Sequence, residues 1–66
     1  MIRYRVKGID NFGKSHYWTP GGGWAGLESA GAFTLRFARG IITDQNIRNR
    51  YLDSDERIEA SLEKIS

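Results

Sequence analysis

The stretch Ile2-Arg3-Tyr4-Arg5-Val6-Lys7 opens the chain with a strict alternation of apolar and basic residues. A period of two, with β-branched and aromatic side chains on one side, is typical of a half-buried strand. The pattern predicts a strand over residues 2–7, around which we expect the rest of the fold to assemble. Its outer face would carry Arg3, Arg5 and Lys7.

A turn and a second extended segment follow this strand. Gly8 and the cluster Asp10-Asn11-Phe12-Gly13 supply turn chemistry. Residues 14–19 then resume an extended, aromatic pattern, which Pro20 ends. We therefore expect a β-hairpin. Its loop is longer than the two-residue ideal, so the turn alone does not fix the register.

Residues 20–30 carry weaker signals. Pro20 and the three glycines 21–23 form a flexible break. We expect a mobile loop there that presents Trp24. Leu27 and Ala30 could then share one side of a single helical turn.

Residues 32–38 fit two structures. Phe33, Leu35 and Phe37 alternate with polar residues as in a strand. Thr34 could instead cap a helix, which would bury Leu35, Ala38, Ile41 and Ile42. We favour a short third strand through Phe33 followed by a helix, although Gly40 inside that helix costs about 1 kcal/mol relative to alanine.

The C-terminal part has a helical pattern. Thr43 or Asp44 can cap a segment that places Ile47, Tyr51 and Leu52 on one side. Asp53 or Ser54 can cap a further helix, whose early acids match the positive end of the helix dipole. Its apolar stripe has the spacing i, i+4 and i+7 and consists of Ile58, Leu62 and Ile65. So narrow a stripe predicts either light packing on the sheet or self-association, as a homodimer zipped through this helix.

The length of 66 residues allows one small domain. We expect residues 1–66 to form an α+β fold, in which a small antiparallel sheet, the hairpin plus a short third strand, packs with one or two C-terminal helices. Residues 1–42 would be the sheet-containing body and residues 43–66 a helical C-terminal extension. With 39% hydrophobic residues and 12% aromatic ones, the composition excludes a disordered chain.

Charge is unevenly distributed along the chain. The formal net charge is +2, but residues 1–52 hold eight basic and three acidic residues, whereas residues 53–66 hold two basic and five acidic ones. A basic body can attract nucleic acid or an acidic protein, and an acidic tail repels nucleic acid or pairs with a neighbouring subunit. No apolar run approaches the roughly 20 residues of a membrane span, so we expect a cytoplasmic protein with no membrane partner.

Two glycine motifs match phosphate-binding patterns only formally. Gly8 to Ser15 fits G-x-x-x-x-G-K-[ST], but that loop needs a helix to begin at the Lys-Ser pair. Here Lys14-Ser15 leads into aromatic residues, a proline and three glycines, which cannot sustain a helix. Gly21 to Gly26 fits G-x-G-x-x-G, but a dinucleotide site needs a strand, a tight turn, a long helix and a later acid, and the bulky indole of Trp24 in the turn places the backbone poorly for pyrophosphate. A hairpin turn and a loop account better for the two stretches.

Catalytic and metal-binding chemistry has few residues to use. His16 is the one histidine and the chain has no cysteine. His16 as a general base would need an orienting carboxylate that the sequence does not place. One histidine without clustered acids cannot make a dedicated metal site. We therefore expect no enzyme activity, no cofactor and no metal.

The remaining signal is a combination of basic and aromatic residues. If the first two strands pair, then Arg3, Arg5 and Lys7 line the outer face, with Lys14, His16 and either Trp18 or Tyr17 beside them. Protein hot spots and single-stranded nucleic-acid sites use this mixture. The expected partner-binding residues are Arg3, Arg5, Lys7, Lys14, His16, Tyr17, Trp18, Trp24, Arg36 and Arg39.

Residues 15–42 resemble small uncharacterised accessory proteins of bacteriophages and mobile elements. The pattern is an aromatic strand, a Gly-Gly-Trp turn, a short Ala-containing turn, a strand Phe and a helix, at Tyr17, Gly22, Gly23, Trp24, Ala30, Phe33, Ala38 and Ile42. The resemblance implies a protein of the bacterial host cytoplasm that binds and blocks a host or host-defence complex, in the manner of an anti-CRISPR protein. The acidic tail favours this protein partner, and the alternative is a small basic protein that binds nucleic acid.

Overall fold

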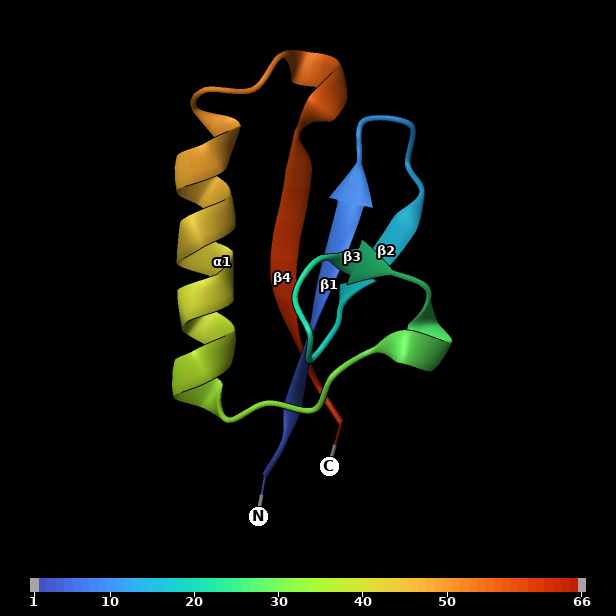
Figure 1. Ribbon diagram of the computed structural model, residues 1–66, viewed down its shortest axis with the longest axis vertical. Coiled ribbons are helices and arrows are strands. Elements are labelled where there is room, and N and C mark those ends of the chain that lie inside the picture. The colour runs from blue at the N-terminus through green and yellow to red at the C-terminus, as the bar shows by residue number, and fades with distance from the viewer. Residues whose placement is uncertain (1, 66) are drawn as a thin grey trace.

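Residues 2–65, which a computed structural model describes, form a four-stranded antiparallel sheet with one α-helix against one of its faces (Figure 1). The strands are β1 (Tyr4–Asp10), β2 (Ser15–Trp18), β3 (Trp24–Ala25) and β4 (Ile58–Lys64), and their order in the sheet is β3-β2-β1-β4. The helix α1 spans Leu35–Asn49, and two short 3-10 turns span Leu27–Ser29 and Ser54–Glu56. The α+β class with an antiparallel sheet is confirmed.

The predicted hairpin is present as β1 and β2. Lys7 pairs with Tyr17 and Ile9 with Ser15. At the turn, the Asp10 carboxylate accepts hydrogen bonds from the backbone N–H groups of Phe12 and Lys14, both at 2.9 Å. β1 lies further along the chain than residues 2–7, because Gly8 continues the strand instead of starting the turn.

Trp24 does not belong to a mobile loop, so that expectation is wrong. The chain reverses between Thr19 and Gly23, where Gly22 and Gly23 adopt φ of 93° and 92°, a region that favours glycine. The Thr19 hydroxyl donates to the Gly22 carbonyl at 2.8 Å and braces the turn. Trp24 then pairs with Trp18 and begins β3. The predicted helical turn near Leu27 is present as the 3-10 turn Leu27–Ser29.

The alternatives for residues 32–38 resolve in favour of a helix. Phe33 makes a single bridge to Tyr4 in place of a third strand. The Thr34 hydroxyl accepts a hydrogen bond from the Phe37 N–H at 3.3 Å and caps α1. α1 runs without a break through residue 43, so the expected caps at Thr43 or Asp44, and a boundary between body and extension there, are wrong.

The expected C-terminal helix is also wrong. The acids after Asp53 begin only the short turn Ser54–Glu56, and residues 58–64 form β4, paired with β1 from Tyr4↔Lys64 to Asp10↔Ile58. Ile58 and Leu62 share one face of this strand, because side chains alternate with a period of two. Ile65 lies just beyond the strand, at a position of opposite parity. The three residues therefore form no helical stripe for self-association.

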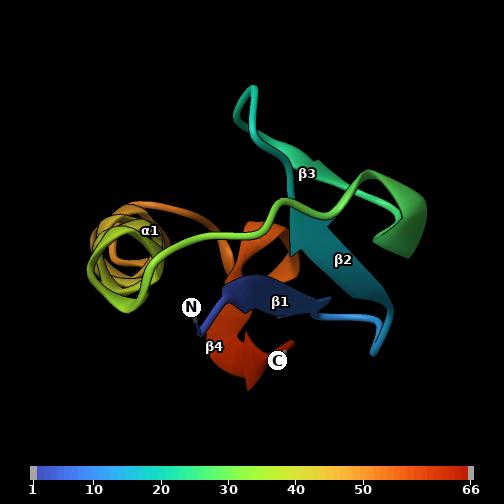
Figure 2. The same ribbon diagram turned by 90° about the horizontal axis from the view of Figure 1, so that it is seen from below.

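The core is small and lies between α1 and the sheet. Val6, Phe33 and Ala38 are buried, and the partly buried Tyr4, Trp18, Trp24, Ile41, Ile42 and Ala60 pack around them. α1 packs on β1 and β4, and Figure 2 shows β2 and β3 continuing the sheet away from the helix. One half of this sheet face is therefore left uncovered. Among residues 2–65, no helix combines the length and apolar character needed to cross a membrane.

Candidate protein-binding groove

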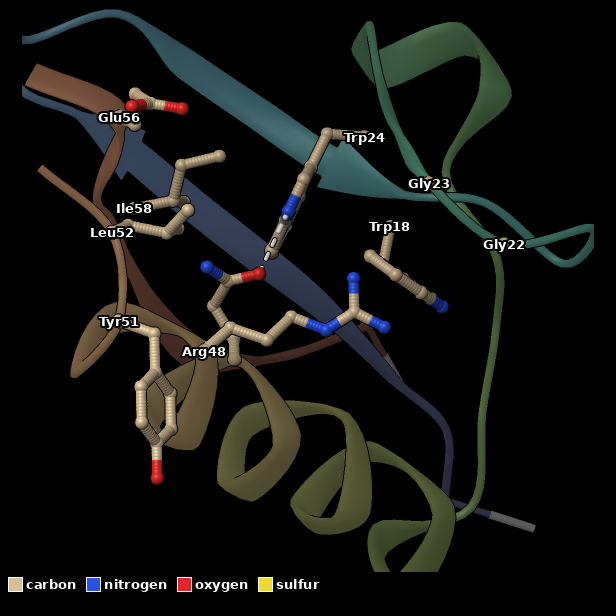
Figure 3. Close-up of a pocket in the computed structure, with 10 residues that line it drawn as sticks. Trp18, Gly22, Gly23, Trp24, Arg48, Tyr51, Leu52, Glu56 and Ile58 are labelled. Carbon is tan, nitrogen blue, oxygen red and sulfur yellow. Dashed lines mark hydrogen bonds between the residues drawn. The ribbon is translucent and has the colours of Figure 1, made fainter.

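A groove runs between α1 and the uncovered half of the sheet. It consists of two hollows that share Trp18, with volumes of about 640 Å³ and about 420 Å³. The larger hollow is lined by Trp18, Gly22, Gly23, Trp24, Gln45, Arg48, Tyr51, Leu52, Glu56 and Ile58 (Figure 3). The smaller is lined by Trp18, Arg36, Phe37, Gly40, Ile41 and Asp44. We call the two hollows together the groove.

The two tryptophans form the sheet side of the groove. Their rings meet edge to face, with centroids 5.1 Å apart and planes 80° apart, a favourable geometry for aromatic pairs. Trp24 also lies over Gly8, where an added Cβ would stand 2.8 Å from the indole and 2.5 Å from Ile58 Cγ2. The absence of a side chain at Gly8 therefore lets the Trp24 indole and Ile58 pack directly against the backbone of β1.

A chain of hydrogen bonds fixes Trp24 to the helix. Its Nε1 donates to Gln45 Oε1 at 3.2 Å, and Gln45 Nε2 donates to Asn49 Oδ1 at 2.9 Å. Asn49 in turn bonds the backbone of Ile58. Within residues 2–65, each fully buried side-chain nitrogen or oxygen has a partner. The position of Trp24 is thus fixed by a fully hydrogen-bonded polar network as well as by apolar packing.

The helix side of the groove brings a cation next to the tryptophans. In Figure 3 the Arg48 side chain extends toward Trp18, while Tyr51 points away from the groove. Arg48 Nε lies 3.1 Å from Asp44 Oδ2, one turn earlier on α1. In the smaller hollow, Phe37 is 59% exposed and stacks on Phe33 with ring centroids 5.2 Å apart. The groove thus combines accessible aromatic surface with two guanidinium groups, Arg48 in the larger hollow and Arg36 in the smaller.

The opposite side of the sheet, which we call the open face, carries the basic residues of β1. Arg5, Lys7 and Tyr17 lie there, because residues paired across strands share a face. The Arg5 guanidinium carbon lies 5.6 Å from the centre of the Tyr17 ring, and Arg5 Nε pairs with Glu63 Oε1. The β4 residues on this face are Glu59, Ser61 and Glu63. Glu63 therefore compensates the charge of Arg5, and Glu59 places a second acid on the same face.

The expected binding residues divide between several places. Tyr17, not Trp18, accompanies Arg5 and Lys7 on the open face. Arg3 lies just before β1, where its carbonyl accepts a hydrogen bond from the Ile65 N–H. Trp18, Trp24 and Arg36 line the groove. Lys14 lies in the exposed hairpin turn, and Arg39 is exposed on α1. A single surface with all of these residues is therefore not formed.

His16 belongs to the hairpin end. Its Nε2 lies 2.8 Å from Asp10 Oδ2. This hydrogen bond is the main cause that holds the pKa of Asp10 below its ordinary value, and the backbone N–H groups of Lys14 and Phe12 act in the same direction. Asp10 is the carboxylate that sequence alone could not place beside His16. Because the same carboxylate caps the turn, the pair fits a structural role.

The two glycine motifs lie in turns and the strands that flank them. β2 begins at Ser15, so a strand follows Lys14 where a phosphate-binding loop requires a helix. Gly21 to Gly26 covers the end of a turn and the two residues of β3. Neither motif is followed directly by an α-helix, which both phosphate-binding patterns require.

Three acids do gather, contrary to the expectation of no clustered acids. Carboxylate oxygens of Asp53, Asp55 and Glu56 lie within 4.8 Å of one another at the 3-10 turn before β4. All three side chains are exposed, so water solvates them without an ion. The cluster does not by itself indicate a metal site.

Among the helix residues at the groove and in its hydrogen-bond network, sequence reasoning predicted Arg36 and missed the others. Gln45 and Asn49 lie seven and eleven positions after Ala38, so they occupy the buried side of α1. A polar residue on an apolar stripe was the available signal, because a buried amide needs a partner. Arg48 and Phe37 carried no such signal, since each is exposed and reaches the groove from its edge.

No protein-family model, no curated protein and no solved structure matches this chain.

Proposed function

We propose that this chain is a non-enzymatic binding protein, whose groove takes up an apolar side chain from an acidic segment of a partner protein. The observation that carries the proposal is the Trp18–Trp24 pair, half-buried at the groove and facing the Arg48 side chain. Tryptophan and arginine dominate the energetics of protein interfaces. A rigid aromatic floor also loses little entropy when it is covered.

Charge favours an acidic segment. α1 carries Arg36, Arg39 and Arg48 against Asp44, and Arg50 caps its C-terminal end. Arg36 and Arg48 line the groove itself. Glu56 lies at the end of the larger hollow away from Trp18 (Figure 3), so an acidic segment would be attracted mainly to the α1 side of the groove. Opposite charges across an interface speed association and fix orientation.

The open face supports the nucleic-acid alternative less well. Binding to a phosphate backbone needs uncompensated cations. Arg5 is paired with Glu63, and Glu59 shares the same face. A salt series with labelled single-stranded and duplex DNA tests the alternative. We expect no binding near physiological salt. Binding whose log affinity falls with log salt at a slope that indicates about four or more phosphate contacts would favour the nucleic-acid alternative.

The resemblance to bacteriophage accessory proteins implies that the partner is a host or host-defence complex. This stays a prediction, as does the bacterial cytoplasm as the place of action. The groove proposal can be tested without knowing the partner.

The test is selection of a random peptide display library on the full chain, followed by affinity measurements from the fluorescence of Trp18 and Trp24. We expect selected peptides to hold an aromatic or aliphatic residue flanked by Asp or Glu. Arg48→Glu should then weaken binding about tenfold or more, which is 1.4 kcal/mol.

Arg39→Glu is the matched control, because it makes the same charge change on the same helix but lies outside both hollows. It should change the affinity by less than about threefold. Equal losses in the two variants, or a selection without acidic apolar peptides, would overturn the groove as the binding site.

A further inference from the structure

β4 has an unpaired edge with a defined pattern of backbone groups. It pairs with β1 on one side, and within residues 2–65 the sheet has no strand on its other side. The Ile65 N–H donates to the Arg3 carbonyl at 2.9 Å, which fixes the phase of this antiparallel ladder. Glu59, Ser61 and Glu63 therefore direct their backbone groups toward β1. Ile58, Ala60, Leu62 and Lys64 direct theirs outward.

Asn49 closes one end of this edge. Its Nδ2 donates to the Ile58 carbonyl at 2.8 Å, and its Oδ1 accepts from the Ile58 N–H at 3.2 Å. The side-chain amide thus takes the place that a neighbouring strand would occupy. The outward N–H and C=O groups that remain on β4 belong to Ala60, Leu62 and Lys64.

We propose that this edge pairs with β4 of a second copy of the chain, antiparallel, with Leu62 opposite Leu62 of the copy. This register sets Ala60 opposite Lys64 of the copy, and Lys64 opposite its Ala60. Each pair of outward residues exchanges two hydrogen bonds, so the three pairs make about six. This register pairs all the outward backbone N–H and C=O groups of Ala60, Leu62 and Lys64. It does not use those of Ile58, which are hydrogen-bonded to Asn49.

Side-chain charges select the same register. Glu63 then faces Ser61 of the copy, and Glu59 faces its Ile65, so no like charges lie directly opposite each other. On the helix side, the two Leu62 side chains, each 38% exposed in the single chain, cover one another. A register centred on Ser61 would set Glu59 against Glu63 twice, which is destabilising. It would also need the Ile58 groups that Asn49 already binds.

The two-fold pairing gives one continuous sheet with both helices on the same side. The groove lies mainly between α1 and the β2–β3 half and touches β4 only at Ile58, outside the three paired residues, so the dimer carries two free grooves. The interface therefore does not depend on the groove proposal, and either can fail without the other.

The first experiment measures the mass of the full chain by sedimentation equilibrium up to about 1 mM. We expect the mass to rise from the 7.5 kDa of one chain toward twice that value. Leu62→Pro should abolish the rise, because it removes an outward N–H and no bond to β1. A mass that stays monomeric in the native chain overturns the proposal.

Charge variants of Ser61 test the register. Ser61→Glu would face Glu63 of the copy but lies beside Lys7 within its own chain, so it should keep the fold and weaken the dimer about tenfold. Ser61→Lys should leave the dimer intact or strengthen it. Equal weakening by both variants would overturn this register, since a Ser61-centred pair suffers from either charge.

Hydrogen exchange provides a readout that does not depend on a variant. The amides of Ser61 and Glu63 bond to β1 and should be protected at every protein concentration. Those of Leu62 and Lys64 should become protected only as the concentration rises. Constant exchange at Leu62 in samples that dimerise would place the interface elsewhere and refute the edge pairing.

Discussion

β1 presents two kinds of residue to the two sides of the sheet. Val6 and Gly8 face α1 and the tryptophans, where Val6 is fully buried and Gly8 leaves room for Trp24 and Ile58. Arg5 and Lys7 face the open side, where Glu63 pairs with Arg5 and each side chain of this pair is about one third exposed. The contacts on the helix side of the sheet thus depend on the shape of the side chains, and those on the open face depend on charge. Changes of shape should therefore cost more than changes of charge.

The largest effect is expected from Gly8→Ala. The added methyl would stand 2.5 Å from Ile58 Cγ2 and 2.8 Å from the Trp24 ring, so the indole or β4 must move. Overpacking of this kind costs about 1–3 kcal/mol, measured by urea unfolding. Gly21→Ala is the control, because its methyl meets open space and its φ is not positive. If the two variants lose the same stability, close packing at Gly8 is not the cause.

The next effect is expected from Gln45→Leu, which keeps the volume but removes the partner of Trp24 Nε1. Loss of this link should reduce the free energy of unfolding by about 1–2 kcal/mol and change the near-ultraviolet circular dichroism of the tryptophans. Asn46→Leu makes a similar change at an exposed position of the same helix. A Gln45 variant as stable as that control would show that apolar packing alone holds the groove.

The open face should contribute less. A double-mutant cycle of Arg5→Ala and Glu63→Ala should give a coupling of about 0.2–1 kcal/mol, which shrinks as salt is added. The test is urea unfolding of the four chains at low and high ionic strength. A coupling energy larger than the stability loss of Gly8→Ala, or one that does not change with salt, would contradict the division between shape and charge.

The smallest effect concerns the hairpin end and depends on pH. The pKa of Asp10 is lowered from 3.8, chiefly by the His16 hydrogen bond. The folded state therefore binds this proton less readily than the unfolded state, so the stabilisation is complete above the unfolded pKa and is lost as pH falls through the folded one. Asp10→Asn should lower the melting temperature at neutral pH, and the difference should shrink in acid.

His16→Ala provides the complementary measurement. It removes the first cause of the shift, so the Asp10 carboxyl resonance should titrate closer to the ordinary value. An unchanged titration would assign the shift to the backbone N–H groups of Lys14 and Phe12 instead.

The hairpin could be predicted from the sequence because its signals are local. Alternation in residues 2–7 and the turn residues Asp10 to Gly13 act within the segment that they shape. The cap at Thr34 is local in the same way. Each of these features depends on neighbours in the chain and is retained in the folded protein.

β4 could not be predicted because its sequence fits two periods. Ile58, Leu62 and Ile65 have helical spacing, while Ile58, Ala60 and Leu62 alternate as in a strand. The open edge of β1, distant in the sequence, decides between the two patterns. The same limit applies to the candidate site. Trp18 and Trp24 were expected to bind a partner, but their face depends on strand parity and on the position of α1.

The pairing of β1 with β4 also affects how the protein is made. Tyr4 pairs with Lys64, so the sheet joins segments from opposite ends of the described chain, and such contacts form slowly because they close a long loop. On the ribosome, β1 and β2 can form a hairpin early, but β1 gains its second neighbour only after residues 58–64 have left the exit tunnel. Until then, Gly8 and Trp24 lack Ile58 beside them, and the nascent chain exposes the apolar surface that β4 later covers.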